Sequence, residues 1–365
     1  MDMPLRFHWR LPFGGETSVI ARSAQADMAA IGRPDLDAQT VFCRAAEEAG
    51  IDSLLTDFGF AKPDPILLAA SLGMSTEQIK FIIAYRSGLM SPATFVQQLN
   101  TLSTLIKGRF SLNIVAGYSP QEQRSYGDFL SHDERYERTT EFLSICRALW
   151  DPDREVSFDG KYYRIENGRL GTPFVNGDRT FPEILVSGSS PPAKKLAIEC
   201  GTCWMRLADT PERLRSETLE MSQQVEVGLR LAVIARPTRD EALEAAYSLV
   251  GGAEVKQQEK RLVQASDSVS IKATYDLADT EWLSACMWTG AVRAYGPTSI
   301  ALVGSADEVA SAFIEYKQVG VSQFILAGWP KLGEMSRFGT EVLPLIRQKE
   351  AELEGRNVAA GSAST

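Results

Sequence analysis

The chain is poor in the residues on which many catalytic sites depend. Its 365 residues include two histidines and five cysteines. We therefore expect no zinc site, and only His8 and His132 are histidine candidates for acid–base catalysis. The cysteines predict reduced thiols in a cytosolic protein. The one CxxC pair is interpreted as a buried helix end, Cys200, followed by a strand residue, Cys203.

Long apolar runs and an excess of positive charge are also missing. No apolar stretch approaches the roughly 18 residues that a membrane span needs. The first residues lack the basic-then-apolar pattern of a signal peptide, so we expect a cytoplasmic protein. The net charge of −9 argues against nucleic acid or an anionic membrane as partner. It leaves room for a local basic pocket that binds an anionic ligand.

What the chain does have is a repeat of short apolar runs and helical patterns. Strands that alternate with helices form a parallel sheet, and eight strands close a barrel, so we predict an α/β fold with a (β/α)8 TIM barrel. A doubly wound open sheet would need a glycine-rich turn leading directly into a helix, and Gly14 and Gly15 are not followed by one. The predicted strands are 5–9, 53–56, 80–85, 110–115, 183–186, 202–205, 228–234 and 323–327.

Two segments interrupt this repeat. Residues 156–165 predict a β-hairpin that turns at Asp159-Gly160. Residues from about 251 to 297, before the last strand, form a long insertion whose aromatic residues argue against permanent disorder, so we interpret it as a mobile cover of the active site. We expect one domain over residues 1–356 and a small, polar, disordered tail at 357–365.

Two further segments predict a phosphate site. His132 and Tyr136 are one helical turn apart at the start of a helical pattern, so they face the same way. A glycine–serine turn at 187–190 lies between an apolar strand and a helical run, where free N–H groups and the positive end of the helix dipole suit a phosphate. The alternative is a helix cap and a plain loop. The predicted cofactor contacts are Asn113, His132, Tyr136, Gly188, Ser189 and Ser190.

Arg230 is the main candidate residue for binding the substrate. Strand alternation places Gly228, Arg230 and Ala232 on the side that faces the barrel interior. A buried arginine is costly unless it pairs with an anion. One interpretation is an internal salt bridge with Asp57; the other is that Arg230 receives an anionic substrate or supports the cofactor.

Other residues at strand ends and in the insertion extend this site. We predict that Arg293 in the insertion clamps one anion together with Arg230 when the cover closes. Trp329, after the last strand, would form a flat wall of the pocket, or the aromatic residues could plug the barrel mouth. The strand-end candidates are Asp57, Phe58, Arg86, Asn113, Tyr118, Trp204, Arg206 and Trp329.

Short motifs in a fixed order carry a resemblance that extends from Leu5 to Arg347. They are the segments 9–12, 91–92, 108–109, 113–117, 132–137, 188–190, 228–231, 301–304 and 326–328. In this order they resemble the bacterial luciferase-like flavin-dependent monooxygenases, and within them the alkanesulfonate monooxygenase branch.

The resemblance implies a TIM barrel that binds reduced FMN (FMNH2), delivered by a separate NAD(P)H-dependent flavin reductase. It implies that O2 adds to the flavin and that the resulting peroxide or hydroperoxide oxygenates a small organic substrate, which we expect to be anionic. It also implies that His132, Tyr136, Ser189 and Ser190 hold the flavin phosphate. We expect a homodimer or homotetramer.

The chain differs from the alkanesulfonate branch at residues that the resemblance places beside the substrate. Gly14, Lys62, Ala232 and Trp329 stand where that branch has His, Cys, His and Tyr. The departures predict a substrate other than an alkanesulfonate. Two alternatives stay open: an F420-dependent oxidoreductase that transfers hydride on the same barrel, and a non-catalytic flavin-binding relative.

Overall fold

The protein is described by a computed structural model that covers residues 3–12, 33–60, 62–151, 153–177, 179–251 and 257–362. The turn at Gly14 and Gly15 therefore lies outside the described residues. Among the residues covered, no helix is both long and apolar enough to cross a membrane.

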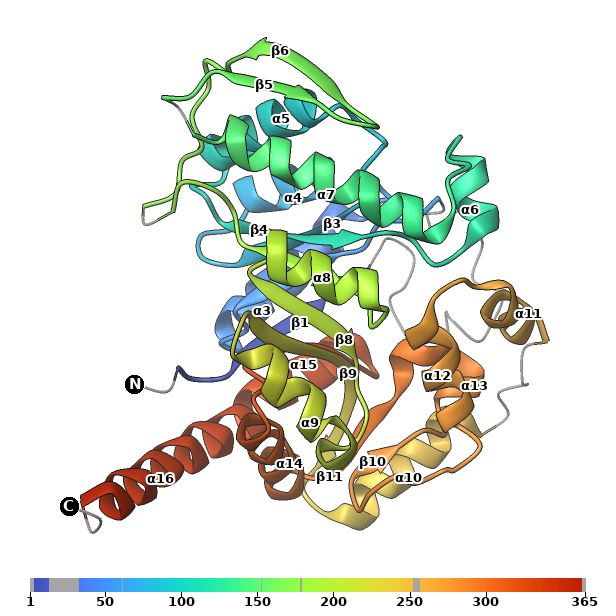
Figure 1. The fold of residues 1–365 in the computed structure, drawn as a ribbon. Coiled ribbons are helices and arrows are strands. Elements are labelled where there is room, and N and C mark those ends of the chain that lie inside the picture. The colour runs from blue at the N-terminus through green and yellow to red at the C-terminus, as the bar shows by residue number, and fades with distance from the viewer. Residues whose placement is uncertain are drawn as a thin grey trace.

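Eight parallel strands form a closed barrel (Figure 1). Each predicted strand is present, and no strand boundary differs from its prediction by more than two residues. The last strand pairs with the first and closes the ring. In ring order the strands are β1 (Arg6–Arg10), β2 (Ser53–Thr56), β3 (Lys80–Tyr85), β4 (Phe110–Val115), β7 (Ile184–Ser187), β8 (Cys203–Leu207), β9 (Glu226–Arg236) and β12 (Gln323–Gly328). The predicted (β/α)8 barrel is confirmed.

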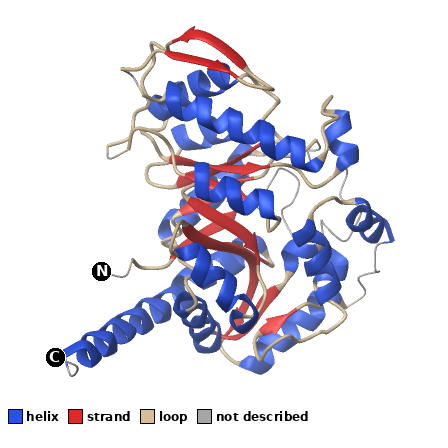
Figure 2. Cartoon of the chain, in the orientation of Figure 1, coloured by secondary structure: helices blue, strands red, loops and turns tan. Residues whose placement is uncertain are grey.

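Helices surround the strands, as Figure 2 shows. Several of them begin with a Ser, Thr or Asp N-cap followed by proline, a pair that accepts the free N–H groups and presets the first helical φ. The helices are α3 (Leu36–Glu48), α4 (Pro65–Met74), α5 (Pro92–Leu105), α6 (Pro120–Ser125), α7 (His132–Leu149), α8 (Pro191–Cys200), α9 (Pro211–Ser222), α10 (Arg239–Val250), α14 (Ala306–Gln318), α15 (Lys331–Arg337), the π-helix η2 (Phe338–Val342) and α16 (Leu343–Ser362).

The chain ends in α16, which extends away from the barrel (Figure 1). The helix continues to Ser362, so most of the segment that we expected to be a disordered tail is helical, and residues 363–365 lie outside the described part. The predicted places of the CxxC pair are confirmed, since buried Cys200 ends α8 and buried Cys203 begins β8.

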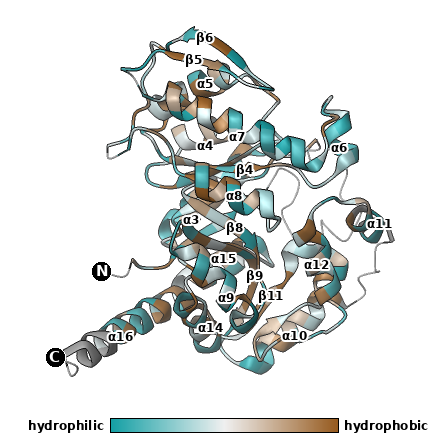
Figure 3. Cartoon of the chain, viewed as in Figure 1, coloured by the Kyte–Doolittle hydropathy of each residue, from teal (hydrophilic) through white to brown (hydrophobic). Residues whose placement is uncertain are grey.

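Side chains fill the barrel on both sides of its wall. Most of the core packs between the strands and the helices, while a smaller cluster, which includes Leu55, Ile82, Met205 and Ile325, fills the lumen. Gly228 faces this lumen, where an added Cβ would lie 2.0 Å from the Met205 sulfur. The outer helices α6 and α9 are largely hydrophilic (Figure 3).

Strand β9 is longer than its neighbours, and two further strands, outside the ring of eight, extend the sheet from it. Its last residues, from Ala232, pair with β11 (Ala301–Ser305), which in turn pairs with β10 (Met287–Trp288). Ala232 consequently packs in a second cluster with Trp288 and residues of α10. We predicted that Ala232 faces the barrel interior. It still pairs with Ala327 of β12 in the barrel wall, but its other neighbour is β11 and not β8, so it packs in the second cluster and not in the cluster that fills the lumen. Strand β11 was not predicted.

The long insertion contains α11 (Gln257–Ala265), α12 (Val269–Leu277), β10 and α13 (Val292–Tyr295), and the 3-10 helix η1 (Pro297–Ser299) follows it. Residues 268–271 of the insertion line the same pocket as residues at the C-terminal ends of the barrel strands. The insertion therefore lies over the face that we predicted. The predicted hairpin is also present, as β5 (Val156–Asp159) and β6 (Arg164–Gly168).

Candidate functional site

A pocket with an empty volume of about 1090 Å³ opens at the C-terminal ends of the barrel strands. It contains all six predicted cofactor contacts, together with Arg230. Six of the eight strand-end candidates line it: Asp57, Phe58, Arg86, Asn113, Tyr118 and Arg206. The insertion adds Ser268, Val269, Ser270 and Ile271, and Thr298 of η1 completes this side.

One side of the pocket, here called the Gly188 end, combines the first turn of α7 with the turn before α8. It comprises His132, Tyr136, Gly188, Ser189 and Ser190. The rings of His132 and Tyr136 are 5.0 Å apart, as expected for residues on one helix face. Gly188 has φ +140°, and an added Cβ would lie 2.7 Å from the Tyr136 hydroxyl oxygen. Only glycine lets the chain pass this close to Tyr136.

Two polar groups at the Gly188 end are available to a ligand. Ser190 is the N-cap of α8, but its side chain makes no capping hydrogen bond. Its buried hydroxyl lies beside the Tyr136 phenol yet has no hydrogen bond of good geometry within the described residues. Burial raises the pKa of Tyr136, against the opposing effects of Ser190 and Arg135, so the phenol is a proton donor at neutral pH.

Trp204 supports this turn from behind. Its indole N–H donates to the Gly188 carbonyl oxygen at 2.6 Å, and the side chain is fully buried. Trp204, which we named among the strand-end candidates, therefore stabilises the turn and does not line the pocket.

Asn113 presents a further polar group. The Ser187 hydroxyl donates to the Asn113 side-chain oxygen at 2.6 Å, which fixes the orientation of the amide. Asn113 is almost fully buried and lines the pocket. Because the Ser187 hydroxyl occupies the side-chain oxygen, the amide nitrogen is the group of Asn113 that could donate to a ligand.

The opposite side of the pocket, here called the Asp57 end, is built around one carboxylate. Arg10 Nε lies 2.5 Å from Asp57 Oδ2, Lys62 Nζ lies 3.5 Å from the same oxygen, and Arg230 Nη2 lies 3.6 Å from Oδ1. Burial alone would raise the pKa of Asp57, but the three cations together hold it well below its usual range. Asp57 is therefore ionised throughout the physiological range.

The salt bridge between Arg230 and Asp57 that we predicted as one interpretation is present, and the role of Arg230 in binding a substrate or cofactor stays a prediction. It pairs with Asp57 and it also lines the pocket. Burial lowers the pKa of Arg230, and Asp57 opposes this effect. At 3.6 Å the contact with Asp57 is too long to be a hydrogen bond, and the guanidinium has five N–H donors. Asp57 therefore does not saturate Arg230.

Arg293 and Trp329 do not line this pocket. The Arg293 guanidinium lies 4.0 Å from the centre of the Tyr275 ring, and its Nη2 is 2.6 Å from Asp279 Oδ1. Trp329 is buried in the second cluster, where its ring centre is 5.4 Å from that of Tyr295. In this structure Arg293 and Trp329 thus make contacts within and beside the insertion, and their proposed roles toward the substrate stay predictions.

Sequence reasoning missed the wall beside Arg86. The Arg86 guanidinium lies 5.0 Å from the centre of the Phe58 ring and 5.7 Å from that of Tyr126. Glu122, on α6, forms an ion pair with Arg86. The strand-end position of Arg86 and Phe58 was a signal, but Glu122 and Tyr126 are distant in sequence and carried none. The described residues contain no group of three metal-ligating side chains.

Three solved structures are similar to the chain over nearly its whole length. An EDTA monooxygenase from Chelativorans sp. BNC1 is 20% identical, with a TM-score of 0.76 over 95% of this chain and 94% of that chain. The oxygenating constituent of 3,6-diketocamphane monooxygenase from Pseudomonas putida, solved in complex with FMN, is 19% identical, with a TM-score of 0.68 over 94% and 99%. An F420-dependent secondary alcohol dehydrogenase is 19% identical, with a TM-score of 0.66 over 94% and 99%.

At these identities the three structures establish the fold alone. The family follows from the sequence, since the model of the family described as luciferase-like monooxygenase matches residues 6–323. The match covers most of the chain, both ends of the pocket and the insertion. The protein therefore belongs to the luciferase-like monooxygenase family and is an oxidoreductase.

Proposed function

We propose that the protein is the oxygenating component of a two-component monooxygenase that uses FMNH2 and O2. The observation that carries the proposal is the Gly188 end, where the uncapped N-terminus of α8, the buried Ser190 hydroxyl and the Tyr136 phenol face one space. Pro191 and Pro192 open α8 and have no N–H. The donors at this end are therefore the other backbone N–H groups of the turn, the serine hydroxyls and the phenol, which together with the helix dipole suit a phosphate. These residues fit the phosphate of FMN.

The residues of the chain would then divide the work. His132, Tyr136, Ser189 and Ser190 would hold the phosphate, and Asn113 would bond to the flavin ring. When bound, reduced flavin supplies the redox chemistry that activates O2. The insertion, which contributes residues 268–271 to the pocket, would exclude water from the reaction. The described residues form one barrel, so we propose that a separate NAD(P)H-dependent reductase delivers the flavin.

We propose an anionic organic substrate at the Asp57 end. Arg230 has donors that Asp57 does not satisfy, and Lys62 also lines the pocket. The EDTA monooxygenase is named for a polycarboxylate, and a related substrate class would suit these cations. Arg230→Gln should raise KM for such a substrate about tenfold or more, because one charge-assisted contact is lost.

Anaerobic titration with FMNH2 tests the cofactor. The double variant Tyr136→Phe/Ser189→Ala should weaken binding by about 1–3 kcal/mol through lost charge-assisted hydrogen bonds. The matched control is Tyr162→Phe/Ser157→Ala, which makes the same chemical changes on the hairpin, where Tyr162 bonds to Glu137. Equal affinities of the two double variants would refute the assignment.

A second candidate is an F420-dependent oxidoreductase, favoured by the similar fold of the F420-dependent alcohol dehydrogenase. Transfer of one oxygen atom from labelled O2 to the substrate in the presence of FMNH2 would support the monooxygenase, whereas O2 consumption alone would not, because free FMNH2 also reacts with O2. Hydride transfer from reduced F420 without O2 would support the second candidate. A chain that binds flavin but supports neither oxygenation of the substrate nor hydride transfer would be a non-catalytic relative.

We also propose that residues 1–356 form one cytoplasmic domain and that the protein assembles as a homodimer or homotetramer. Light scattering coupled to size exclusion would measure the mass of the assembly, and a mass of about 40 kDa would contradict it.

A further inference from the structure

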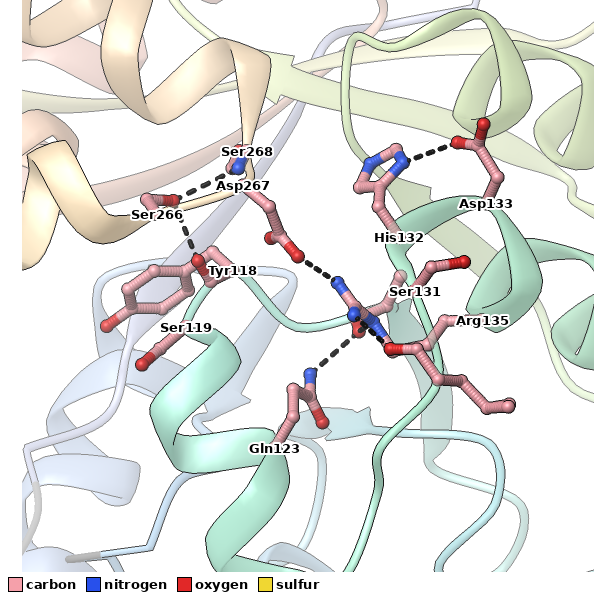
Figure 4. A network of polar contacts seen from close by, with 12 residues as sticks. Tyr118, Ser119, Gln123, Ser131, His132, Asp133, Arg135, Ser266, Asp267 and Ser268 are labelled. Carbon is pink, nitrogen blue, oxygen red and sulfur yellow. Dashed lines mark hydrogen bonds and ion pairs between the residues drawn. The ribbon is translucent and has the colours of Figure 1, made fainter.

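The insertion is fastened to the barrel by a compact group of polar contacts at residues 266–268 (Figure 4). The Ser266 hydroxyl donates to the Tyr118 carbonyl oxygen at 2.7 Å, and the Asp267 N–H donates to the same oxygen at 3.2 Å. The Ser268 N–H donates to the Ser266 hydroxyl oxygen at 3.1 Å. The segment is thereby fixed to the loop after β4.

Arg135 is the centre of this attachment. Its Nη2 is 2.5 Å from Asp267 Oδ2, while its Nε donates to the Ala116 carbonyl oxygen at 2.9 Å and its Nη1 to the Leu130 carbonyl oxygen at 3.0 Å. The arginine is 2% exposed. One buried side chain on α7 thus joins the loop after β4, the loop before α7 and the insertion.

The attachment places a helix N-terminus at the pocket. Ser268 is the N-cap of α12, and its hydroxyl accepts the N–H of Ile271. The N–H groups of the first turn of a helix have no partner within the helix. Ser268, Val269 and Ser270 line the pocket together with His132 and Ser190, which mark the N-terminal turns of α7 and α8. Three helix N-termini therefore border one pocket, and the buried Ser190 hydroxyl there lacks a well-formed hydrogen bond to any described residue.

We infer that Arg135 and Asp267 form a positioning pair that sets the first turn of α12 over the Gly188 end, where Ser268–Ser270 complete the phosphate-binding surface. This inference rests on the proposed use of FMNH2. Positive ends of three helix dipoles attract a phosphate more strongly than two. The pair also joins the insertion to α7, the helix that carries Tyr136. Binding of the phosphate therefore favours the position in which the insertion lies over the pocket.

The arrangement predicts that the pair acts on the phosphate and not on the rest of the flavin. FMNH2 and reduced riboflavin differ by that phosphate alone, so the ratio of their affinities isolates its contribution. A merely structural role of Arg135 and Asp267 would weaken both ligands equally and leave the ratio unchanged.

The test is anaerobic titration of Asp267→Asn with FMNH2 and with reduced riboflavin. The ratio of affinities should fall about fivefold or more, because α12 loses its fixed position at the phosphate. The matched control is Asp279→Asn, which removes a different ion pair of the insertion, that with Arg293, and should leave the ratio within about twofold.

A second variant protects the test against misfolding. Ser270→Ala leaves the Arg135–Asp267 pair intact and should lower the same ratio, because it removes one hydroxyl at the phosphate. An unchanged ratio in both Asp267→Asn and Ser270→Ala overturns the inference. If the natural chain itself binds FMNH2 no better than reduced riboflavin, the proposed phosphate site fails instead, so the two failures are distinguishable.

Discussion

The Gly188 end and the Asp57 end face each other across the barrel, since β7 and β1 lie four strands apart in the ring. The Gly188 end takes its side chains from two helix starts, each with a recognisable local pattern. The Asp57 end takes Arg10, Asp57, Lys62 and Arg230 from distant parts of the chain. At the first, sequence reasoning placed every residue in the pocket. At the second, it placed Asp57 and Arg230 but also chose Arg293 and Trp329, which do not line the pocket.

The two ends also differ in how they are stabilised. At the Gly188 end the groups that face the pocket are neutral hydroxyls and backbone N–H groups, which cost little to leave open toward solvent. At the Asp57 end the groups are charged and buried, and they stabilise one another only while the carboxylate is present. We therefore expect changes at the Asp57 end to act on folding and changes at the Gly188 end to act on binding.

The largest expected effect is that of Asp57→Asn. The variant removes the carboxylate shared by three cations, and breaking a buried ion pair in this way costs about 3–5 kcal/mol of unfolding free energy. Urea denaturation measures it. Asp279→Asn, whose carboxylate is largely exposed, is the control and should cost no more than about 1 kcal/mol. A loss below about 1 kcal/mol for Asp57→Asn would remove the contrast between the two ends.

The next largest effect is a loss of stability at low pH that depends on His8, a buried residue of the barrel that does not line the pocket. His8 lies on β1, two residues before Arg10, and its ring bonds to Gln323. Burial lowers the pKa of His8 to about 4, below that of an unfolded histidine at about 6.5. The unfolded chain therefore binds the proton first. The stability that neutral His8 contributes is present above about pH 6.5 and is lost as the pH falls toward 4, by up to about 3 kcal/mol.

Urea denaturation of the natural chain and of His8→Gln between pH 7 and pH 4 measures this dependence. The difference between the two curves should change across this window, because the variant has no imidazole to protonate. Parallel curves would show that His8 does not titrate on unfolding.

A smaller effect is expected at the Gly188 end. In Gly188→Ala the new methyl group would meet the Tyr136 hydroxyl oxygen at 2.7 Å and the Ala193 Cβ at 2.9 Å. We expect the turn to shift and FMNH2 affinity to fall by about 1–3 kcal/mol. Gly171→Ala is the control, since nothing lies within 4 Å of its added Cβ. Full affinity in Gly188→Ala would show that the turn does not hold the cofactor.

The smallest effect is expected for Arg293→Ala. Its partner Asp279 is largely exposed, and such surface pairs contribute about 0–1 kcal/mol. KM for the substrate should change less than about twofold, in contrast to the rise expected for Arg230→Gln. Steady-state kinetics of the two variants measures the difference. An equal rise in KM would support the prediction that Arg230 and Arg293 clamp one anion when the insertion closes over the pocket.

The sequence determined the barrel and the Gly188 end. Strand and helix periodicities depend on neighbouring residues, so all eight strands were predicted, and the hairpin with them. The pair His132 and Tyr136 faces one way because one helical turn separates them. The glycine–serine turn before α8 likewise predicts a helix N-terminus that can bind an anion, because a few adjacent residues form the whole pattern.

Only the tertiary structure decided the rest of the site. It added Arg10 and Lys62 to the pair of Asp57 and Arg230. It also joined Asp267 to Arg135 across 132 residues and buried Trp329 beside Tyr295. It also paired the end of β9 with β11, so that Ala232 packs in the second cluster and not in the cluster that fills the lumen. The physical reason is that these contacts join segments far apart in the chain, and their geometry exists only once the strands have closed into a ring and the insertion has packed on it.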